Sequence, residues 1–253
     1  MDNIDEIIDS CYGIMIARGD LAIEVPAEKV PGIQRMIIKK CIAAKKPVIV
    51  ATQMLHTMID NPLPTRAEVS DIANAVYYRT DAVMLSGETA NGKYPLEAVQ
   101  TMASIIREAE ATLEADYNDE VPYSKEVSTT TAFLAKQAVR SVDQIHTEAI
   151  VTDSFTGRTA RYLSSFRATV PVCAVCYDAT LSRQLALSYG VTAHFAEGAC
   201  DKARFAAGVK HFIADGLLKE DTQVAYMSGT VGQTGAAHSL EIDTVKDLLA
   251  KNA

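Results

Sequence analysis

The sequence predicts an α/β protein made of two successive series of parallel βα units. In the first series, short apolar runs start at positions 12, 48 and 82, and each is followed by a polar loop and a stretch with helical periodicity. A polar stretch without sustained periodicity, residues 113–127, separates this series from a second set of apolar runs. Repeated strand, loop and helix order is typical of parallel sheets flanked by helices.

The first series carries specific signals for its strands and helices. Strands are expected at residues 12–17, 48–51 and 82–85. An apolar stripe from Ile33 to Ala44 indicates a helix after the first strand. Thr65 and Glu68 have capping-box spacing for the second helix, and Pro95 stands where the first turn of the third helix tolerates proline.

The second series predicts a mixed sheet. Five strands are expected, at residues 149–152, 172–176, 191–195, 224–227 and 239–242. The last two have no helical stretch between them, so we expect them to form a hairpin. Together the patterns predict a first domain over residues 1–112, a linker over 113–127 and a second α/β domain over 128–253.

Composition and charge narrow the classes of function. The 253 residues carry a formal net charge of -8, which argues against a nucleic-acid binder, because such proteins need a basic face. The acidic start, Met1–Glu6, lacks the basic region of a signal peptide, and no run approaches the roughly 20 apolar residues that span a bilayer. We therefore expect a cytoplasmic protein.

The five cysteines indicate reduced thiols, because their number is odd and they are widely scattered. Cys173 and Cys176 form a C-x-x-C pair, a spacing that also occurs in redox and metal motifs. They fall, however, on an expected buried strand, where residues three apart point to opposite faces. Their thiols should therefore not meet.

Each of the three early strands ends in a polar cluster. The clusters are Arg18–Asp20, Thr52–Gln53 and Ser86–Thr89. In parallel βα folds, ligands bind at the carboxyl ends of the strands. A single cluster of this kind is usually only a polar turn, but three in succession favour one convergent active site.

The residue types in these clusters suit an anionic, metal-bound ligand. Asp20 is a hard oxygen ligand suited to Mg²⁺, although a carboxylate at this position is also typical of a helix N-cap. Gly19 lets backbone N–H groups approach an anion, and a helix that starts there favours negative charge. Thr52 can donate a hydrogen bond to a substrate oxygen.

Two other patterns are misleading. Arg18–Asp20 spells a cell-adhesion tripeptide, but that function needs an exposed extracellular loop, and this tripeptide ends an expected buried strand. Gly87–Lys93 nearly spells a phosphate-binding P-loop, but Tyr94 stands where serine or threonine should bind Mg²⁺.

The second domain has a candidate anion site of its own. A segment with hydroxyl groups, a glycine and an arginine follows its first strand and opens a helix, a combination that favours a bound anion. The candidate residues are Thr152, Ser154, Thr156, Gly157, Arg158 and Thr159. The glycine-rich stretch Ser228–Gly235 could close over them. Asp153 is an unfavourable neighbour for a phosphate, and the alternative interpretation is a set of capping residues beside a flexible loop.

The motifs of the first domain closely resemble the pyruvate kinase family, in order and in spacing. The stretches that carry the resemblance are Gly13–Leu21, Val25–Val30, Ala51–Leu55, Pro64–Glu68, Met84–Ala90 and Tyr94–Val99. The later half resembles the family's C-terminal regulatory domain, with less specific motifs. The resemblance implies that residues 1–112 are the last three βα units of a (β/α)8 TIM barrel, followed by the family's C-terminal α/β domain with a mixed five-stranded sheet.

The resemblance also implies an activity: transfer of a phosphoryl group from phosphoenolpyruvate to ADP, giving pyruvate and ATP in glycolysis. Asp20 would be one of two carboxylates on the catalytic Mg²⁺ or Mn²⁺, K⁺ would be a second cofactor, and Gly19, Asp20 and Thr52 would bind the substrate. The implied catalytic residues are Arg18, Thr52, Ser86 and Glu88. The anion site would take a phosphorylated sugar effector, and the family's oligomer is a tetramer.

In the family, several functional elements precede the position of Met1. They are the lysine on the transferring phosphoryl group, the second metal carboxylate, the K⁺ and nucleotide-phosphate contacts, and a β-rich lid domain. The chain alone is therefore expected to be inactive. The alternative function is a non-catalytic module that binds a sugar phosphate and forms oligomers. A different phosphoenolpyruvate-handling barrel enzyme is disfavoured, because the motif string is nearly continuous.

Overall fold

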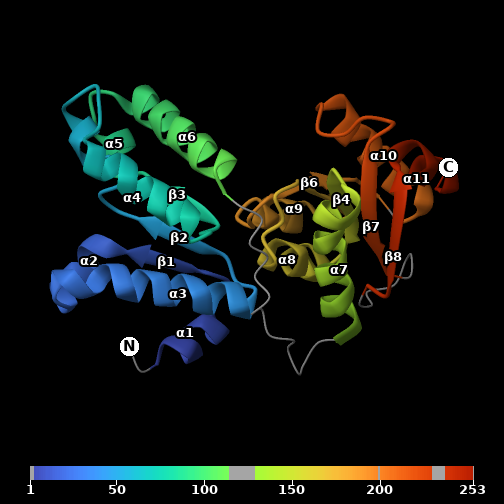
Figure 1. Ribbon diagram of the computed structural model, residues 1–253, viewed down its shortest axis with the longest axis horizontal. Helices are drawn as coiled ribbons and strands as arrows, with labels where there is room; N and C mark the ends of the chain where they lie inside the picture. The colour runs from blue at the N-terminus through green and yellow to red at the C-terminus, as the bar shows by residue number, and fades with distance from the viewer. Residues whose placement is uncertain (1–2, 114–128, 199, 230–236, 253) are drawn as a thin grey trace. The chain divides into compact units, whose positions relative to one another are not determined.

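The computed structural model describes residues 3–113, 129–198, 200–229 and 237–252, and it divides into two compact units, Met1–Asp116 and Tyr117–Ala253 (Figure 1). Each unit has its own sheet, of three strands in the first and five in the second. The expected linker over 113–127 lies, apart from Leu113, outside the described residues.

The first unit is built on a parallel sheet with the strand order β1-β2-β3. Its strands are β1 (Ile14–Ala17), β2 (Val48–Ala51) and β3 (Ala82–Met84). All three expected strands are confirmed, although the first begins at Ile14 and not at residue 12. The ladder starts where Ile14 N–H donates to the Pro47 carbonyl at 2.9 Å. Gly13 lies so close to Pro47 that a Cβ atom on it would be 2.6 Å from the same oxygen.

Helical segments follow each strand, as the periodicity predicted. They are α2 (Arg18–Glu24), η1 (Ala27–Lys29), α3 (Val30–Ala44), η2 (His56–Ile59), α4 (Arg66–Tyr77), α5 (Gly87–Ala90) and α6 (Pro95–Ala111). One further helix, α1 (Ile4–Ser10), precedes β1. Helix α3 lies against β1 and β2, and α4 packs on α6. Proline opens α6 at its first position, where its missing N–H costs nothing.

The predicted capping box at the start of α4 is confirmed. Thr65 Oγ1 accepts a hydrogen bond from Glu68 N–H at 3.3 Å, and the Glu68 carboxyl accepts from Thr65 N–H at 2.7 Å. Glu68 also accepts from Thr57 N–H at 2.7 Å, which ties η2 to α4. Partial burial pushes the pKa of Glu68 upward, but the hydrogen bonds from Thr57 and Thr65 outweigh it, so its pKa is lowered. The first turn of α4 is therefore firmly held.

The second unit contains the expected mixed five-stranded sheet, in the order β6-β5-β4-β7-β8. The strands are β4 (Ala149–Ser154), β5 (Val172–Cys176), β6 (Val191–Phe195), β7 (Gln223–Ser228) and β8 (Ser239–Thr244). The pair β7–β8 is antiparallel and the other three pairs are parallel, which confirms the predicted mixed sheet and hairpin.

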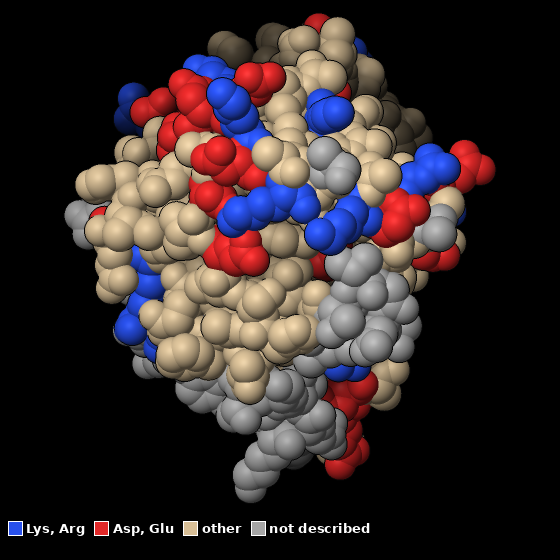
Figure 2. Space-filling view, turned by 90° about the vertical axis from the view of Figure 1, so that its right-hand side faces the viewer, with Lys and Arg blue, Asp and Glu red and all other residues tan. Residues whose placement is uncertain are grey.

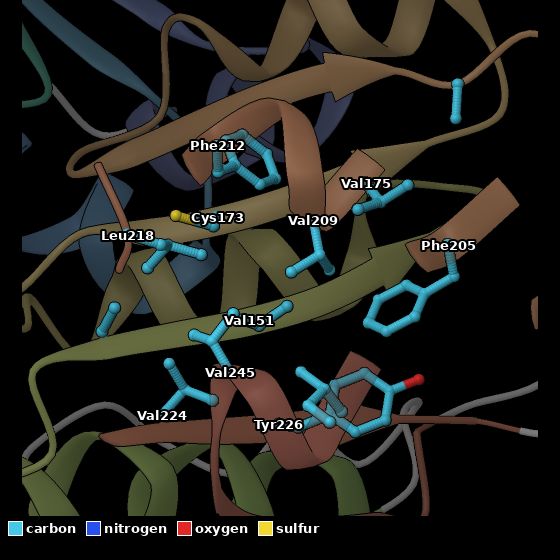
Figure 3. Packing of buried hydrophobic residues seen from close by; sticks show 13 residues of the cluster. Val151, Cys173, Val175, Phe205, Val209, Phe212, Leu218, Val224, Tyr226 and Val245 are labelled. Carbon is cyan, nitrogen blue, oxygen red and sulfur yellow. The ribbon is translucent and has the colours of Figure 1, made fainter. Parts of the chain in front are cut away.

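Helices lie on both faces of this sheet. They are α7 (Thr129–Ile145), α8 (Arg158–Ser165), α9 (Ala179–Leu185), α10 (Lys202–Ala214) and α11 (Val245–Lys251). Figure 3 shows the apolar cluster on the face covered by α10 and α11, where Val151 of β4 lies near Val209 of α10 and Val245 of α11. Because side chains alternate along a strand, Asp153 points to the same face as Val151, and Thr152 points to the opposite one.

The C-x-x-C pair lies on β5, as expected. Both cysteines are buried and form no disulfide, and Cys173 belongs to the apolar cluster of Figure 3. Burial raises the pKa of Cys173 and of Cys176 to about 12, with Asp178 adding to the effect at Cys176. Both thiols are therefore protonated near neutral pH, whereas a reactive cysteine needs a lowered pKa.

The surface charge is mixed. Figure 2 shows lysine and arginine side chains interspersed with aspartate and glutamate on the face that it displays. With a net charge of -8 for the chain, this differs from the basic surface with which proteins neutralise nucleic-acid phosphates. Among the described residues, none of the helices combines the length and the apolar character needed to cross a membrane.

Candidate active site

The register of the three-stranded sheet places the three polar clusters at one edge. Ala17 pairs with Ala51, and Ala51 pairs with Met84, so the strands end side by side (Figure 1). Helix α2 begins at Arg18, immediately after β1, and Ser86 directly precedes α5. The carboxyl ends of the strands thus form a common surface, the position at which βα proteins bind ligands.

The turn after β2 has an unusual backbone conformation. Thr52 has a φ of 69° and Gln53 a φ of 55°, so both residues lie in the left-handed region. This region is uncommon for residues with a side chain and is strained for a β-branched one such as threonine. Each such residue costs on the order of 1–3 kcal/mol, and strain of this kind clusters at functional sites where the surroundings enforce it.

A hydrogen bond between two clusters orients the Thr52 side chain. The Thr52 hydroxyl oxygen accepts from Gly19 N–H at 2.8 Å. The hydroxyl proton takes no part in this bond, so the group can still act as a donor. The Thr52 side chain is therefore held in place by Gly19, with its hydroxyl proton not used by this contact.

The Arg18 side chain faces the turn after β2. Its Nε donates to the Ala51 carbonyl at 3.3 Å, and its Nη2 donates to the Thr52 carbonyl at 2.7 Å. Its Nη1 forms an ion pair with Asp71 Oδ2 at 2.5 Å. The guanidinium is thus bonded to the protein on all three nitrogens and is mostly buried, which also argues against an exposed adhesion motif.

Asp20 lies in the first turn of α2, and its side chain is exposed. The N-cap of this helix is Ala17, so the interpretation of Asp20 as an N-cap is wrong. Within the described part of the chain, no three His, Cys, Asp or Glu side chains come together in a way that could hold a metal ion. Asp20 is thus a single exposed carboxylate at this edge, and oxygen ligands of this type suit Mg²⁺.

Ser86 and Glu88 differ sharply in exposure. Ser86 is exposed, while Glu88 is 1% exposed. The Glu88 carboxyl accepts from Leu55 N–H at 3.1 Å and from Ser86 N–H at 2.9 Å. Glu88 thereby joins the loop after β2 to the loop after β3, and of these two candidate residues Ser86 is the accessible one.

Replacing Glu88 should loosen this junction. Glu88→Ala leaves the N–H of Leu55 and that of Ser86 without their carboxyl acceptor, and we expect a loss of about 3–5 kcal/mol in unfolding free energy, since a hydrogen bond to a charged group contributes about 1.5–3 kcal/mol. Glu88→Gln keeps the shape but only one acceptor oxygen, so about half that loss is expected. Urea unfolding followed by NMR signals of the first unit measures both.

The matched control is Glu97→Gln, at an exposed position of α6, which should change the unfolding free energy by less than about 0.5 kcal/mol. Equal stability of the Glu88→Gln and Glu97→Gln variants would contradict the anchoring role.

The stretch that resembles a P-loop has a different structure. Its first four residues form α5, and Gly92 packs on the Glu88 carbonyl, where a Cβ atom would come within 2.3 Å of the oxygen. Lys93 forms an exposed ion pair with Asp60 at 2.9 Å. The lysine that would contact phosphate in a P-loop is thus directed to another partner.

The candidate anion site of the second unit lies between β4 and α8. Thr152 is fully buried, and its hydroxyl donates to the Met227 carbonyl at 2.8 Å. Ser154 Oγ accepts from Gly157 N–H at 3.0 Å. Gly157 has a φ of 74°, and a Cβ atom on it would lie 2.6 Å from Arg161 Nη1, so this turn requires glycine. Thr152 and Ser154 therefore shape the loop.

The other candidates are more accessible. Thr156 and Arg158 are exposed, and Thr159 is partly buried in the first turn of α8. Arg161 donates to the Thr156 carbonyl at 2.9 Å and brings a second guanidinium to the loop. In the stretch Ser228–Gly235, residues 230–235 lie outside the described residues.

Asp153 differs from the other residues of this loop because its side chain is acidic. Burial raises its pKa to about 6. The pKa of Tyr177 and that of Tyr226 are also raised. Burial is the main cause, and the charge of Asp153 adds to it. Asp153 therefore lies at the rim of the apolar cluster, on the side of the sheet away from Thr152.

Sequence reasoning did not identify Asp71. Its partner Arg18 is 53 residues away along the chain. An aspartate in the middle of a helix is ordinarily a solvated surface residue, so no local signal distinguishes it. Only the packing of α4 beside the strand ends reveals its contact.

Comparison with known proteins gives consistent matches. The family model described as pyruvate kinase, barrel domain, matches residues 1–99, and the model described as pyruvate kinase, alpha/beta domain, matches residues 133–242. The pyruvate kinase of Borreliella burgdorferi is 43% identical over 254 residues, covering 98% of this chain and 53% of the relative. That of Leishmania mexicana is 45% identical over 224 residues, covering 86% of this chain and 44% of the relative.

A solved structure shows the same fold. A crystal structure of a pyruvate kinase from Cryptosporidium parvum aligns with a TM-score of 0.88 at 33% identity, covering 96% of this chain and 49% of that one. The chain spans about half the length of the curated relatives it matches.

Proposed function

Because models of both pyruvate kinase domains match it, the chain belongs to the pyruvate kinase family, and we propose that it serves phosphoryl transfer from phosphoenolpyruvate to ADP. The products are pyruvate and ATP, and the reaction is a step of glycolysis. The observation that carries this proposal is the convergence of Gly19, Asp20 and Thr52 at the carboxyl edge of β1, β2 and β3. The division into a barrel segment over 1–112 and a regulatory domain over 128–253 is part of the same proposal.

Each residue at this edge has a proposed task. The first turn of α2, with Gly19 and Asp20, receives the substrate carboxylate; since Gly19 N–H already donates to Thr52, the backbone N–H of Asp20 is the proposed donor, and Gly19 keeps the approach open. Thr52 donates to a substrate oxygen, Ser86 lines the site from the third strand, and Glu88 holds Ser86 in place. These groups position the substrate, which is the main contribution a protein makes to phosphoryl transfer.

A divalent cation, Mg²⁺ or Mn²⁺, and K⁺ are the proposed cofactors. Asp20 supplies one carboxylate oxygen to the divalent cation, and its exposure leaves that oxygen accessible. When bound, the cation neutralises charge on the phosphoryl oxygens. The family uses further groups, which are proposed to come from outside the described residues. They are the lysine, the second carboxylate, and the K⁺ and nucleotide contacts.

The second unit is proposed to regulate the protein by binding an anionic effector, a sugar phosphate, at the loop from Thr152 to Thr159. The exposed cation Arg158 supports this, with Arg161 beside it on the Thr156 carbonyl, while Asp153 opposes the binding of a phosphate above about pH 6. A homotetramer in the cytoplasm is the proposed setting, on the basis of family membership.

An assay of pyruvate formation from phosphoenolpyruvate and ADP, with Mg²⁺ and K⁺, tests the function. We expect no turnover by the 253-residue chain alone. We expect turnover when the chain is fused behind the preceding segment of the Borreliella burgdorferi relative, which the chain matches over 53% of its length.

Two outcomes would contradict this account. A folded but inactive fusion would show that this chain's strand ends do not form part of such a site. Turnover by the chain alone would show that the groups assigned to the preceding segment are dispensable. In the first case, the alternative function, a non-catalytic module that binds an effector and forms oligomers, is the one the loop of the second unit supports.

A further inference from the structure

The strained turn after β2 needs a restraint, because Thr52 and Gln53 both have positive φ and neither is glycine. In the structure the Arg18 guanidinium supplies one. It binds the carbonyl groups of Ala51 and Thr52, at 3.3 and 2.7 Å, from the side of β1. The two carbonyls flank the point where the chain leaves the strand and enters the left-handed turn.

The guanidinium is in turn fixed from α4. Asp71 Oδ2 accepts from Arg18 Nη1 at 2.5 Å, and the Arg18 side chain is only 12% exposed. Helix α4 is a firm base for this contact, because its first turn is fixed by the capping box of Thr65 and Glu68. A charge-assisted bond from a planar guanidinium sets direction as well as distance.

We propose that Asp71 is a positioning residue, which acts through Arg18 to hold the Thr52–Gln53 turn in its left-handed conformation and so aims the Thr52 hydroxyl at the substrate. The chain of contacts runs from Asp71 to Arg18 to the Thr52 carbonyl, and from the Thr52 hydroxyl to Gly19 N–H. Arg18 therefore acts on the backbone of Thr52, and its contribution to the reaction passes through that residue. The kinetic consequence rests on the proposed function, but the structural consequence does not.

The structural test uses the 253-residue chain and Asp71→Asn, which keeps the shape but removes the charge that orients Arg18. We expect the amide NMR signals of Gly19 and Thr52 to shift and broaden, because the turn samples more than one conformation. The matched control is Asp5→Asn, which removes a surface ion pair with Lys40, 2.6 Å long, in the same unit, and should leave both signals unchanged. Unchanged Gly19 and Thr52 signals in folded Asp71→Asn would overturn the proposal.

The kinetic test uses whichever form of the protein turns over phosphoenolpyruvate. Asp71→Asn should lower kcat by about 10²-fold, the effect of misplacing a reacting group by about 1 Å, with little change in the KM for ADP. Asp71→Glu, which restores the charge, should recover part of the loss. Arg18→Lys combined with Asp71→Asn should be no worse than Arg18→Lys alone, because the two residues act in series.

The outcomes separate this inference from the proposed function. Loss of the Gly19 and Thr52 signals in Asp71→Asn, without turnover in any form of the protein, would sustain the positioning role and reject the reaction. Equal kcat in wild type and Asp71→Asn would reject the positioning role and leave the reaction intact. If Asp71→Asn does not fold, Asp71→Glu carries both readouts, because it displaces the carboxylate by one methylene group. Wild-type kcat together with unchanged Gly19 and Thr52 signals in Asp71→Glu would overturn the proposal.

Discussion

Asp20→Ala should abolish turnover of phosphoenolpyruvate, with a fall in kcat of at least about 10³-fold. Asp20 is the exposed carboxylate at the first turn of α2, and it is the metal ligand that this chain is proposed to supply. A divalent cation contributes several kcal/mol by neutralising charge that develops on the phosphoryl oxygens, and each 1.36 kcal/mol corresponds to a factor of ten in rate. Steady-state kinetics of the fused protein at saturating Mg²⁺ measures the loss.

The design separates metal binding from folding. Glu24→Ala removes an exposed carboxylate from the last turn of the same helix and should leave kcat within about twofold of wild type. Asp20→Glu keeps a carboxylate but moves it by one methylene group, so an intermediate rate and a weaker apparent Mg²⁺ affinity are expected. A wild-type rate in Asp20→Ala would remove Asp20 from the metal site and leave the strand edge as a substrate-binding surface only.

The strand and helix pattern was predictable because it depends on local signals. The runs at Val48–Ala51 and Val172–Cys176 coincide with β2 and β5, since a short apolar run bounded by polar loops reports a buried strand directly. The capping box of Thr65 and Glu68 was visible for the same reason: its two partners are three residues apart.

The parts of the site that were not predictable depend on contacts between distant segments. Nothing in the residues around Asp71 indicates that it binds Arg18, and nothing around Thr52 indicates a positive φ, which the sequence would sooner suggest for a glycine. The resemblance implied a catalytic role for Glu88 without indicating that it is buried and joined to Leu55 and Ser86. Such roles follow from the packed arrangement of three loops, which no single stretch of sequence specifies.

The same limit applies to the second unit. Thr152 and Ser154 have the hydroxyl groups that an anion site needs, but the hydroxyl of Thr152 is bonded to Met227 and the oxygen of Ser154 to Gly157. The residue types were therefore enough to identify the loop in the sequence. The hydrogen bonds show which of its residues fix the loop conformation and which are exposed. Of the two arginines at this loop, Arg158 is exposed, whereas Arg161 is partly buried and bonded to the Thr156 carbonyl.

Asp153→Asn should make the second unit more stable than wild type above about pH 6. Burial raises the pKa of Asp153 from 3.8 to about 6, so the folded state binds this proton more tightly than the unfolded state does. The contribution of Asp153 to stability is therefore complete below about pH 4 and is lost as the pH rises through about 6. At 1.36 kcal/mol for each pKa unit, the charged carboxylate costs at most about 3 kcal/mol at pH 7, and asparagine, which cannot ionise, avoids that cost.

The measurement is urea unfolding of wild type and Asp153→Asn between pH 4 and 8, followed through NMR signals of β4 and β5 so that the second unit is observed alone. Relative to Asp153→Asn, the unfolding free energy of wild type should fall between pH 4 and 6. Above pH 6 the difference in unfolding free energy between the two proteins should stay constant. Asp143→Asn, at an exposed position of α7, is the control and should parallel wild type. Parallel curves for wild type and Asp153→Asn would mean that the rim of the apolar cluster leaves this carboxylate fully hydrated.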